Sequence, residues 1–84
     1  MSKVLVKYRG YLASIAGVQE ETCDARDVDE LLKSLGKHRG RELEKKARAM
    51  MITHNGKNIL LLKRYKTLLS EGDTVSFYPI CAGG

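Results

Sequence analysis

Aromatic side chains, proline and cysteine are scarce in this chain, which has no Trp, one Phe, one Pro and two Cys in 84 residues. Cys23 and Cys81 belong to no Cys-x-x-Cys or Cys/His spacing, so the sequence predicts neither a metal site nor a disulfide framework. No apolar run approaches the roughly 20 residues that a membrane span requires. A strand-like segment directly follows Met1-Ser2-Lys3, which leaves no signal-peptide core. We therefore expect a cytoplasmic protein with reduced thiols and no membrane partner.

Acidic residues are in the minority, with 10 Asp and Glu against 15 Lys and Arg, and the formal net charge is +5. The positive charge is densest from Lys37 to Arg48, but this stretch also contains Glu42 and Glu44. A solvated helix face is therefore favoured over a phosphate-binding patch. The predicted strands lack the aromatic pattern on which nucleic-acid-binding domains stack bases. A small basic nucleic-acid-binding domain stays an alternative, but nucleic acid is not the expected partner.

A length of 84 residues suits one domain with a modest core and is short for a deep catalytic cleft.

The N-terminal part of the chain is predicted to form a β-hairpin. Residues 3–9 alternate apolar and basic side chains, which indicates a half-buried strand. We expect a loop or short turn over residues 11–17, closed by Gly17. Residues 18–23 are more polar and predict an edge strand paired with the first.

A helix is predicted to begin after Asp27, which is a favourable N-cap with Glu30 three residues later. The apolar residues that follow have the i, i+3, i+4, i+7 spacing of one helix face, namely Val28, Leu31, Leu32 and Leu35. Gly36 is in the position of a left-handed C-terminal cap. Residues 40–47 favour a second, exposed helix.

The C-terminal half is predicted to consist mainly of strands. The expected segments are a strand over residues 48–53, a tight turn at Asn55-Gly56, a return strand over 59–62, a connector with one helical turn over 63–70, a turn at 71–73 and a last strand over 74–78. The first and last strands are the most apolar and should be central. This order predicts an α+β, β-grasp fold with a mixed sheet of about five strands and one main helix across one face.

The last seven residues follow the last predicted strand and are Tyr78-Pro79-Ile80-Cys81-Ala82-Gly83-Gly84. Two glycines can enter a tunnel too narrow for any Cβ atom. We expect a single domain over 1–84 with a flexible tail at 79–84 that presents a terminal carboxylate. The simpler alternative is a frayed glycine tail without a function.

These residues resemble the small subunit of molybdopterin synthase, within the ubiquitin-like sulfur carriers that end in Gly-Gly. That family typically ends in aromatic-Pro-Pro-Val-Ala/Ser-Gly-Gly, and here Ile80 replaces the second proline and Cys81 the valine. Gly72-Asp73-Thr74-Val75 and Asn55-Gly56 also match recurring family segments. The thiamine-pathway sulfur carrier shares the fold and the Ala-Gly-Gly end. Pro79 after an aromatic residue favours the molybdopterin side.

The resemblance implies a covalent carrier in molybdenum or tungsten cofactor biosynthesis, a small non-catalytic subunit that binds no cofactor itself. An adenylating enzyme of the ubiquitin-activating type would use ATP and Mg²⁺ to activate Gly84. A cysteine desulfurase or rhodanese would supply the sulfur for a thiocarboxylate, and the large subunit of molybdopterin synthase would hold the acceptor. The expected partner-binding residues are Tyr78, Pro79, Ile80, Cys81, Ala82 and Gly83.

Several alternatives stay open at this point. The same activated Gly84 could be joined to lysines of target proteins, or could carry sulfur for thiamine, cysteine or tRNA thiolation. Cys81 could trap a partner cysteine, although filling a small apolar pocket is favoured. Phe77 has the parity of the core, and Tyr78 on the opposite face could contact a partner or pack at an edge. Cys23 is expected to be structural and His54 to lie on the surface.

Overall fold

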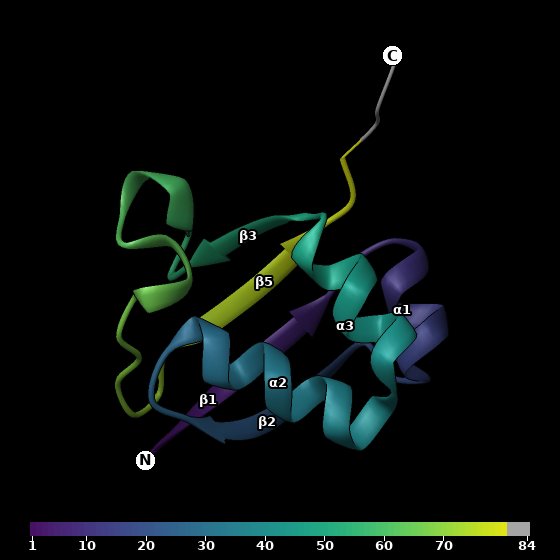
Figure 1. Cartoon of the computed structure of the whole chain (residues 1–84), viewed down its shortest axis with the longest axis horizontal. Helices are drawn as coiled ribbons and strands as arrows, with labels where there is room; N and C mark the ends of the chain where they lie inside the picture. The colour runs from purple at the N-terminus through teal and green to yellow at the C-terminus, as the bar shows by residue number, and fades with distance from the viewer. Residues whose placement is uncertain (81–84) are drawn as a thin grey trace.

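The computed structural model describes residues 1–80, which form a five-stranded mixed sheet with helices across one face (Figure 1). In chain order the elements are β1 Ser2–Tyr8, α1 Tyr11–Ala16, β2 Glu20–Ala25, α2 Val28–Arg39, α3 Arg41–Arg48, β3 Met51–His54, β4 Lys57–Asn58, the 3₁₀ turns η1 Ile59–Leu61 and η2 Arg64–Lys66, and β5 Thr74–Tyr78. The predicted β-grasp architecture is confirmed. Within the described residues, no helix has the length and apolar character needed to cross a membrane.

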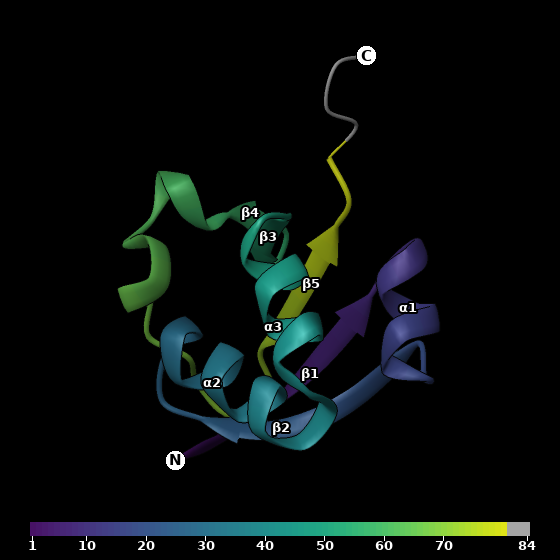
Figure 2. The ribbon, with the colours of Figure 1, turned by 45° about the vertical axis from the view of Figure 1, so that its right-hand side comes forward.

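The sheet has the strand order β2-β1-β5-β3-β4, so β1 and β5 lie inside it as predicted. β1 is antiparallel to β2 and parallel to β5, and β5 is antiparallel to β3. Tyr8 is opposite Phe77 in the parallel pair. Because the two strands run in the same direction, the chain leaves β1 and β5 at the same end of the sheet (Figures 1 and 2). This end carries the base of the C-terminal tail.

The core lies between the sheet and the helices. The alternating side chains Val4, Val6 and Tyr8 of β1 are buried, with at most 2% of their surface exposed. Phe77 is fully buried, as its parity predicted, and its ring stacks on that of Tyr8 with 6.2 Å between centroids. Leucines of α2 cover these strands, as the apolar spacing of the helix requires.

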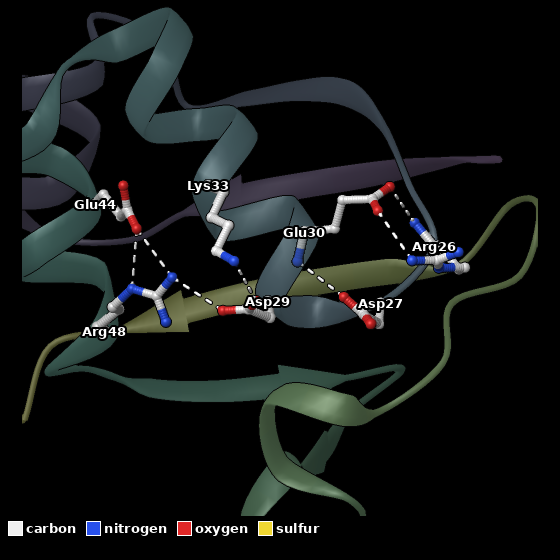
Figure 3. A network of polar contacts seen from close by, with 7 residues as sticks. All are labelled: Arg26, Asp27, Asp29, Glu30, Lys33, Glu44 and Arg48. Atoms are coloured by element: carbon white, nitrogen blue, oxygen red, sulfur yellow. Dashed lines mark hydrogen bonds and ion pairs between the residues drawn. The ribbon is translucent and has the colours of Figure 1, made fainter.

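Helix α2 begins as predicted and ends later than predicted. Asp27 accepts a hydrogen bond from the backbone N–H of Glu30 at 2.8 Å, while the Glu30 carboxylate accepts one from the N–H of Arg26 (Figure 3). Gly36 does not cap the helix. It is buried inside α2 against Glu44 of α3, and the helix continues to its C-cap Gly40 at φ 107°. The glycine expected to end the helix instead allows two helices to approach closely.

Helix α3 is less exposed than predicted. Leu43 and Ala47 are fully buried, so its apolar face packs on the core while its basic residues face outward. Arg48 donates to Glu44 Oε2 at 2.9 Å and to Asp29 Oδ1 at 3.1 Å, which ties α3 to α2 (Figure 3). One cation of the basic stretch therefore has a structural role.

Two further expectations are corrected. Residues 11–16 form the short helix α1 rather than a loop, because Leu12 and Ala16 are one turn apart and both enter the core. Gly17 closes this segment, as expected, and the structure shows it in the left-handed conformation. The return strand after the confirmed Asn55-Gly56 turn is only Lys57–Asn58. The Asn58 side chain accepts a hydrogen bond from the N–H of Leu60 and begins η1, so the predicted strand over 59–62 does not form.

Candidate functional site

The candidate site is the base of the C-terminal tail, where the chain leaves the end of β5. Tyr78 is the last residue of β5, and Pro79 and Ile80 follow it. The backbone N–H of Arg9 donates to the carbonyl of Phe77 at 3.2 Å, which anchors this end of β5 to β1. The remaining predicted site residues, Cys81, Ala82, Gly83 and Gly84, lie outside the described residues.

The ring of Pro79 lies over Gly10, the residue that opens α1. A Cβ atom added to Gly10 would be 2.7 Å from Cγ of Pro79, well inside normal contact. Gly10 also has φ 59° and ψ −141°, a conformation open to glycine and strained for other residues. Gly10 therefore leaves space for Pro79, whose own fixed φ limits bending at the base of the tail.

We expect Gly10→Ala to displace Pro79 and Ile80 and to lower the free energy of unfolding by about 1–3 kcal/mol, because the new Cβ meets the proline ring in a strained conformation. The check is a comparison of NMR chemical shifts and of contacts between residue 10 and the Pro79 ring. Gly17→Ala is the matched control, since Gly17 has φ 81° and open space around the added Cβ. A Gly10→Ala variant with unchanged Pro79 and Ile80 signals would contradict this role.

Tyr78 lies on the sheet face away from the helices, where it is half-buried opposite Met51 of β3. Its neighbours on this face, Ser76 and Thr53, are buried and have short side chains, so the tyrosine ring has no bulky side chain beside it at these two positions. Met51 is 38% exposed and Ile80 is 62% exposed. The part of the predicted contact set that the structure describes thus contains a partly exposed aromatic residue and an exposed isoleucine at the tail base.

An apolar groove of about 600 Å³ adjoins this surface between α3, β3 and the two 3₁₀ turns. The residues that line it are Arg48, Met50, Met51, Ile52, Asn58, Ile59, Leu60, Arg64, Tyr65 and Ile80. Tyr65 donates a hydrogen bond to the carbonyl of Arg48 at 3.2 Å, and the Arg48 guanidinium lies 5.1 Å from the Tyr65 ring centre. These contacts fix the wall that η2 contributes to the groove.

Comparison with known proteins identifies the family. The protein-family model described as the ThiS family matches residues 6–84, almost the whole chain. The chain belongs to the ThiS family. A search of curated proteins found no match.

Solved structures confirm the ubiquitin-like β-grasp fold of this ThiS-family chain. Small archaeal modifier protein 1 from Methanosarcina acetivorans is 26% identical with a TM-score of 0.88, over 100% of this chain and 98% of that one. A Pyrococcus furiosus protein described as molybdopterin converting factor subunit 1 is 24% identical with a TM-score of 0.79, over 96% and 100%. A complex of subunits 1 and 2 of molybdopterin-converting factor from Helicobacter pylori matches at 24% identity and a TM-score of 0.69, over 98% and 99%.

The other predicted chemical groups lie away from the tail base. The Cys23 thiol is half-buried on β2, 3.4 Å from Ser34 Oγ, and burial raises its pKa, which fits the expected structural role. No group of three or more potential metal ligands occurs among residues 1–80, the part of this ThiS-family chain that the structure describes.

His54 is not the surface residue that was expected. Only 17% of its side chain is exposed, and its Nε2 is 2.7 Å from Oδ2 of Asp73, in the turn before β5. Asp73 also accepts hydrogen bonds from the Asn55 side chain and from the backbone N–H of Ser70. The hydrogen bond from His54 is the main reason that the pKa of the Asp73 carboxyl lies below its usual value. This network joins the β3–β4 hairpin to the start of β5, and no spacing in the sequence revealed it.

We expect Asp73→Ala to lower the free energy of unfolding by about 1–3 kcal/mol, because three donors lose a partially buried acceptor. A carboxyl with a lowered folded-state pKa stabilises the fold above its unfolded pKa and loses this effect as the pH falls. The difference between wild type and variant should therefore shrink below about pH 4. Urea unfolding from pH 5 to pH 3, with the exposed Asp24→Ala as control, measures it. A difference that stays constant over this range would contradict the role of Asp73.

Proposed function

We propose that this chain is a sulfur carrier that is adenylated and then thiocarboxylated at Gly84 and donates sulfur in molybdopterin biosynthesis. The observation that carries the proposal is the ThiS-family match, which extends through Gly84. The geometry of the tail base supports it, because the tail begins at an interior strand and its first residue, Pro79, packs against Gly10. A rigid base with a glycine end suits delivery of a terminal group into a partner.

The chemistry of a carboxylate explains why partners are needed. Its charge is delocalised and its leaving group would be oxide, so it must first be activated. In the proposed sequence the Gly84 carboxylate attacks the α-phosphorus of ATP on an adenylating enzyme and displaces pyrophosphate, while Mg²⁺ offsets the phosphate charge. A persulfide from a cysteine desulfurase or rhodanese then displaces AMP from the acyl-adenylate. This step forms a C–S bond, and a thiol of the donor then cleaves the S–S bond that came from the persulfide, which leaves the thiocarboxylate on Gly84 and a disulfide on the donor.

The aromatic-proline pair Tyr78-Pro79 supports a role in molybdopterin biosynthesis, since it matches the end of the family's molybdopterin synthase members. The Pyrococcus and Helicobacter structures support it at the level of the fold. In this role the large subunit of molybdopterin synthase binds the chain, and the anionic thiocarboxylate attacks a pterin precursor held there. Pro79 and Ile80 offer no titratable side chain, so proton transfer falls to the partner.

A second candidate function is protein modification. The archaeal structure named as a modifier protein has 26% identity and a TM-score of 0.88 to this chain. The same acyl-adenylate of Gly84 could react with a lysine amine of a target protein. The two functions share the activation step and differ only in the nucleophile that follows it.

Separate products distinguish these functions. The thiocarboxylated chain, incubated with a molybdopterin synthase large subunit and the pterin precursor, should yield molybdopterin and return to the carboxylate form. The chain with an unmodified carboxylate is the control. Failure to form molybdopterin, together with Gly-Gly remnants on lysines in digests of the host cell's proteins, would favour the modifier function instead.

A further inference from the structure

The turn between β3 and β4 contains the one Asn-Gly pair of the chain. Asn55 and Gly56 both have positive φ, 51° and 87°, as in the tight turns that this pair favours. Both residues are exposed to solvent. The only other asparagine is Asn58, which is followed by the branched residue Ile59. Asn55 is therefore the asparagine with the less hindered backbone nitrogen after it.

An asparagine in this position can lose its amide without any enzyme. The backbone nitrogen of Gly56 gives up its proton and attacks Cγ of Asn55, so that an N–C bond forms, the Cγ–Nδ2 bond breaks and ammonia leaves. Water then opens the resulting cyclic imide at either carbonyl and yields aspartate or isoaspartate. Glycine favours ring closure because it has no Cβ atom to obstruct the approach. Asparagine is accordingly counted among the thermolabile residues of proteins.

The fold holds both polar atoms of the Asn55 amide. Its Oδ1 accepts a hydrogen bond from the backbone N–H of Thr74 at 2.8 Å, and its Nδ2 donates one to Oδ1 of Asp73 at 3.1 Å. The backbone N–H of Asn55 also donates to the carbonyl of Thr74 at 2.8 Å. Ring closure makes Cγ tetrahedral and moves its oxygen and nitrogen, so both side-chain hydrogen bonds have to break first. The turn is therefore protected while it stays against the start of β5.

The carboxylate that holds this amide is itself fixed on its other side. Asp73 Oδ2 lies 2.7 Å from Nε2 of His54 and accepts a hydrogen bond from the backbone N–H of Ser70 at 2.8 Å. These contacts turn Oδ1 toward Asn55. The other strand of the hairpin, β4, has only two residues and lies at the edge of the sheet. Opening of this edge costs few buried contacts, so it needs less free energy than unfolding of the whole domain.

We propose that Asn55 is a deamidation site, which reacts when the turn detaches from the start of β5 and leaves a product that no longer fits there. In the aspartate product a carboxylate faces Asp73 in place of the Nδ2 donor, and like charges at this distance repel. In the isoaspartate product the backbone gains one methylene group inside a tight turn, which disturbs the pairing of His54 with Lys57. Either product loosens the hairpin from β5. The inference does not depend on the reaction at Gly84.

Peptide mapping by mass spectrometry measures the reaction as the replacement of NH₂ by OH at Asn55. A carboxyl methyltransferase specific for isoaspartate, with labelled S-adenosylmethionine, detects the second product. At neutral pH we expect Asn55 to react in the chain unfolded by guanidinium chloride, and to react about tenfold or more slowly in the folded chain. Asn58 is the internal control and should stay unchanged over the same time. Gly56→Ala should slow the reaction of the unfolded chain, because its Cβ atom obstructs the attacking nitrogen.

Equal rates in the folded and the unfolded chain would overturn the inference, and so would an unfolded chain that does not react at Asn55. Two destabilised variants then separate local from global opening. Asp73→Ala removes the acceptor of Nδ2 and should speed the reaction of the folded chain about tenfold. Val28→Ala removes buried atoms at the start of α2 but keeps the contacts of the turn, so it should speed the reaction much less. Equal acceleration by the two variants would contradict the local route.

The aspartate product is tested directly by Asn55→Asp, which should have a lower melting temperature than wild type at neutral pH. Asn58→Asp is the matched control, because an aspartate there keeps the acceptor for the N–H of Leu60. Adding Asp73→Asn to Asn55→Asp restores a donor and an acceptor with their roles exchanged, so the double variant should be more stable than the sum of the single effects predicts. An Asn55→Asp chain as stable as wild type, or strictly additive effects, would show that the product still fits against β5.

Discussion

Deletion of Gly83 and Gly84 is expected to reduce adenylation and sulfur transfer to background and to leave the melting temperature nearly unchanged. The deletion removes the proposed reacting carboxylate from the position that a partner can reach. The two residues have no side chains, so their deletion removes almost no apolar area from the chain. ATP–pyrophosphate exchange measures activation, and thermal unfolding measures stability.

Gly83→Ala is a milder companion to this deletion, since it keeps the length of the tail and its carboxylate but adds one Cβ atom. We expect it to lower activity, because the added atom would meet the walls of a narrow tunnel. Sulfur transfer that survives the deletion would mean that the C-terminus does not react. The basic surface from Lys37 to Arg48 would then be the next candidate. A collapse of the melting temperature would place the tail in the core.

Leu31→Ala is expected to lower the free energy of unfolding by about 2–5 kcal/mol, because it leaves a cavity between α2 and the sheet. Leu31 is fully buried, and domains of this size often have only about 5–15 kcal/mol of stability in total. Urea denaturation of the variant against wild type measures the loss. Leu68→Ala removes the same atoms from a side chain that is 68% exposed and should change stability little. Similar small changes in both variants would show that α2 does not form the core.

Regular periodicity was the part of the fold that the sequence could predict. The alternation in β1, the apolar stripe of α2 and the Asn55-Gly56 turn each depend on local chemistry that a single segment displays. Helix α1 was missed because its six residues include no side-chain cap and only two core positions, Leu12 and Ala16. The segment 59–62 was misassigned because an apolar run is compatible with a strand, whereas here the Asn58 side chain caps a 3₁₀ turn that begins at Ile59.

Only the sequence motif of the candidate site could be predicted, and not the surfaces around it. Tyr78-Pro79 and the glycines are contiguous, so the sequence displays them together. The groove is formed by residues of α3, β3 and the 3₁₀ turns together with Ile80, and these segments come together only on folding. The signal that the sequence offered for the groove is the apolar run from Ile59 to Leu62, directly before Lys63-Arg64. The preceding strand β4 has only two residues, so this run is longer than that strand can bury. The close approach of Gly10 and Pro79 follows from the β1–β5 register and has no local signature.

Intact-mass spectrometry tests the central claim most directly. The full chain is incubated with its adenylating enzyme, ATP, Mg²⁺ and a persulfide donor, and the same mixture without ATP is the control. We expect a mass increase equal to the replacement of one oxygen atom by sulfur, located by fragmentation at Gly84 and absent from the control. An unchanged mass with an adenylating enzyme that is active on another ThiS-family chain, or a sulfur atom located at Cys23 or Cys81, would contradict the carrier function.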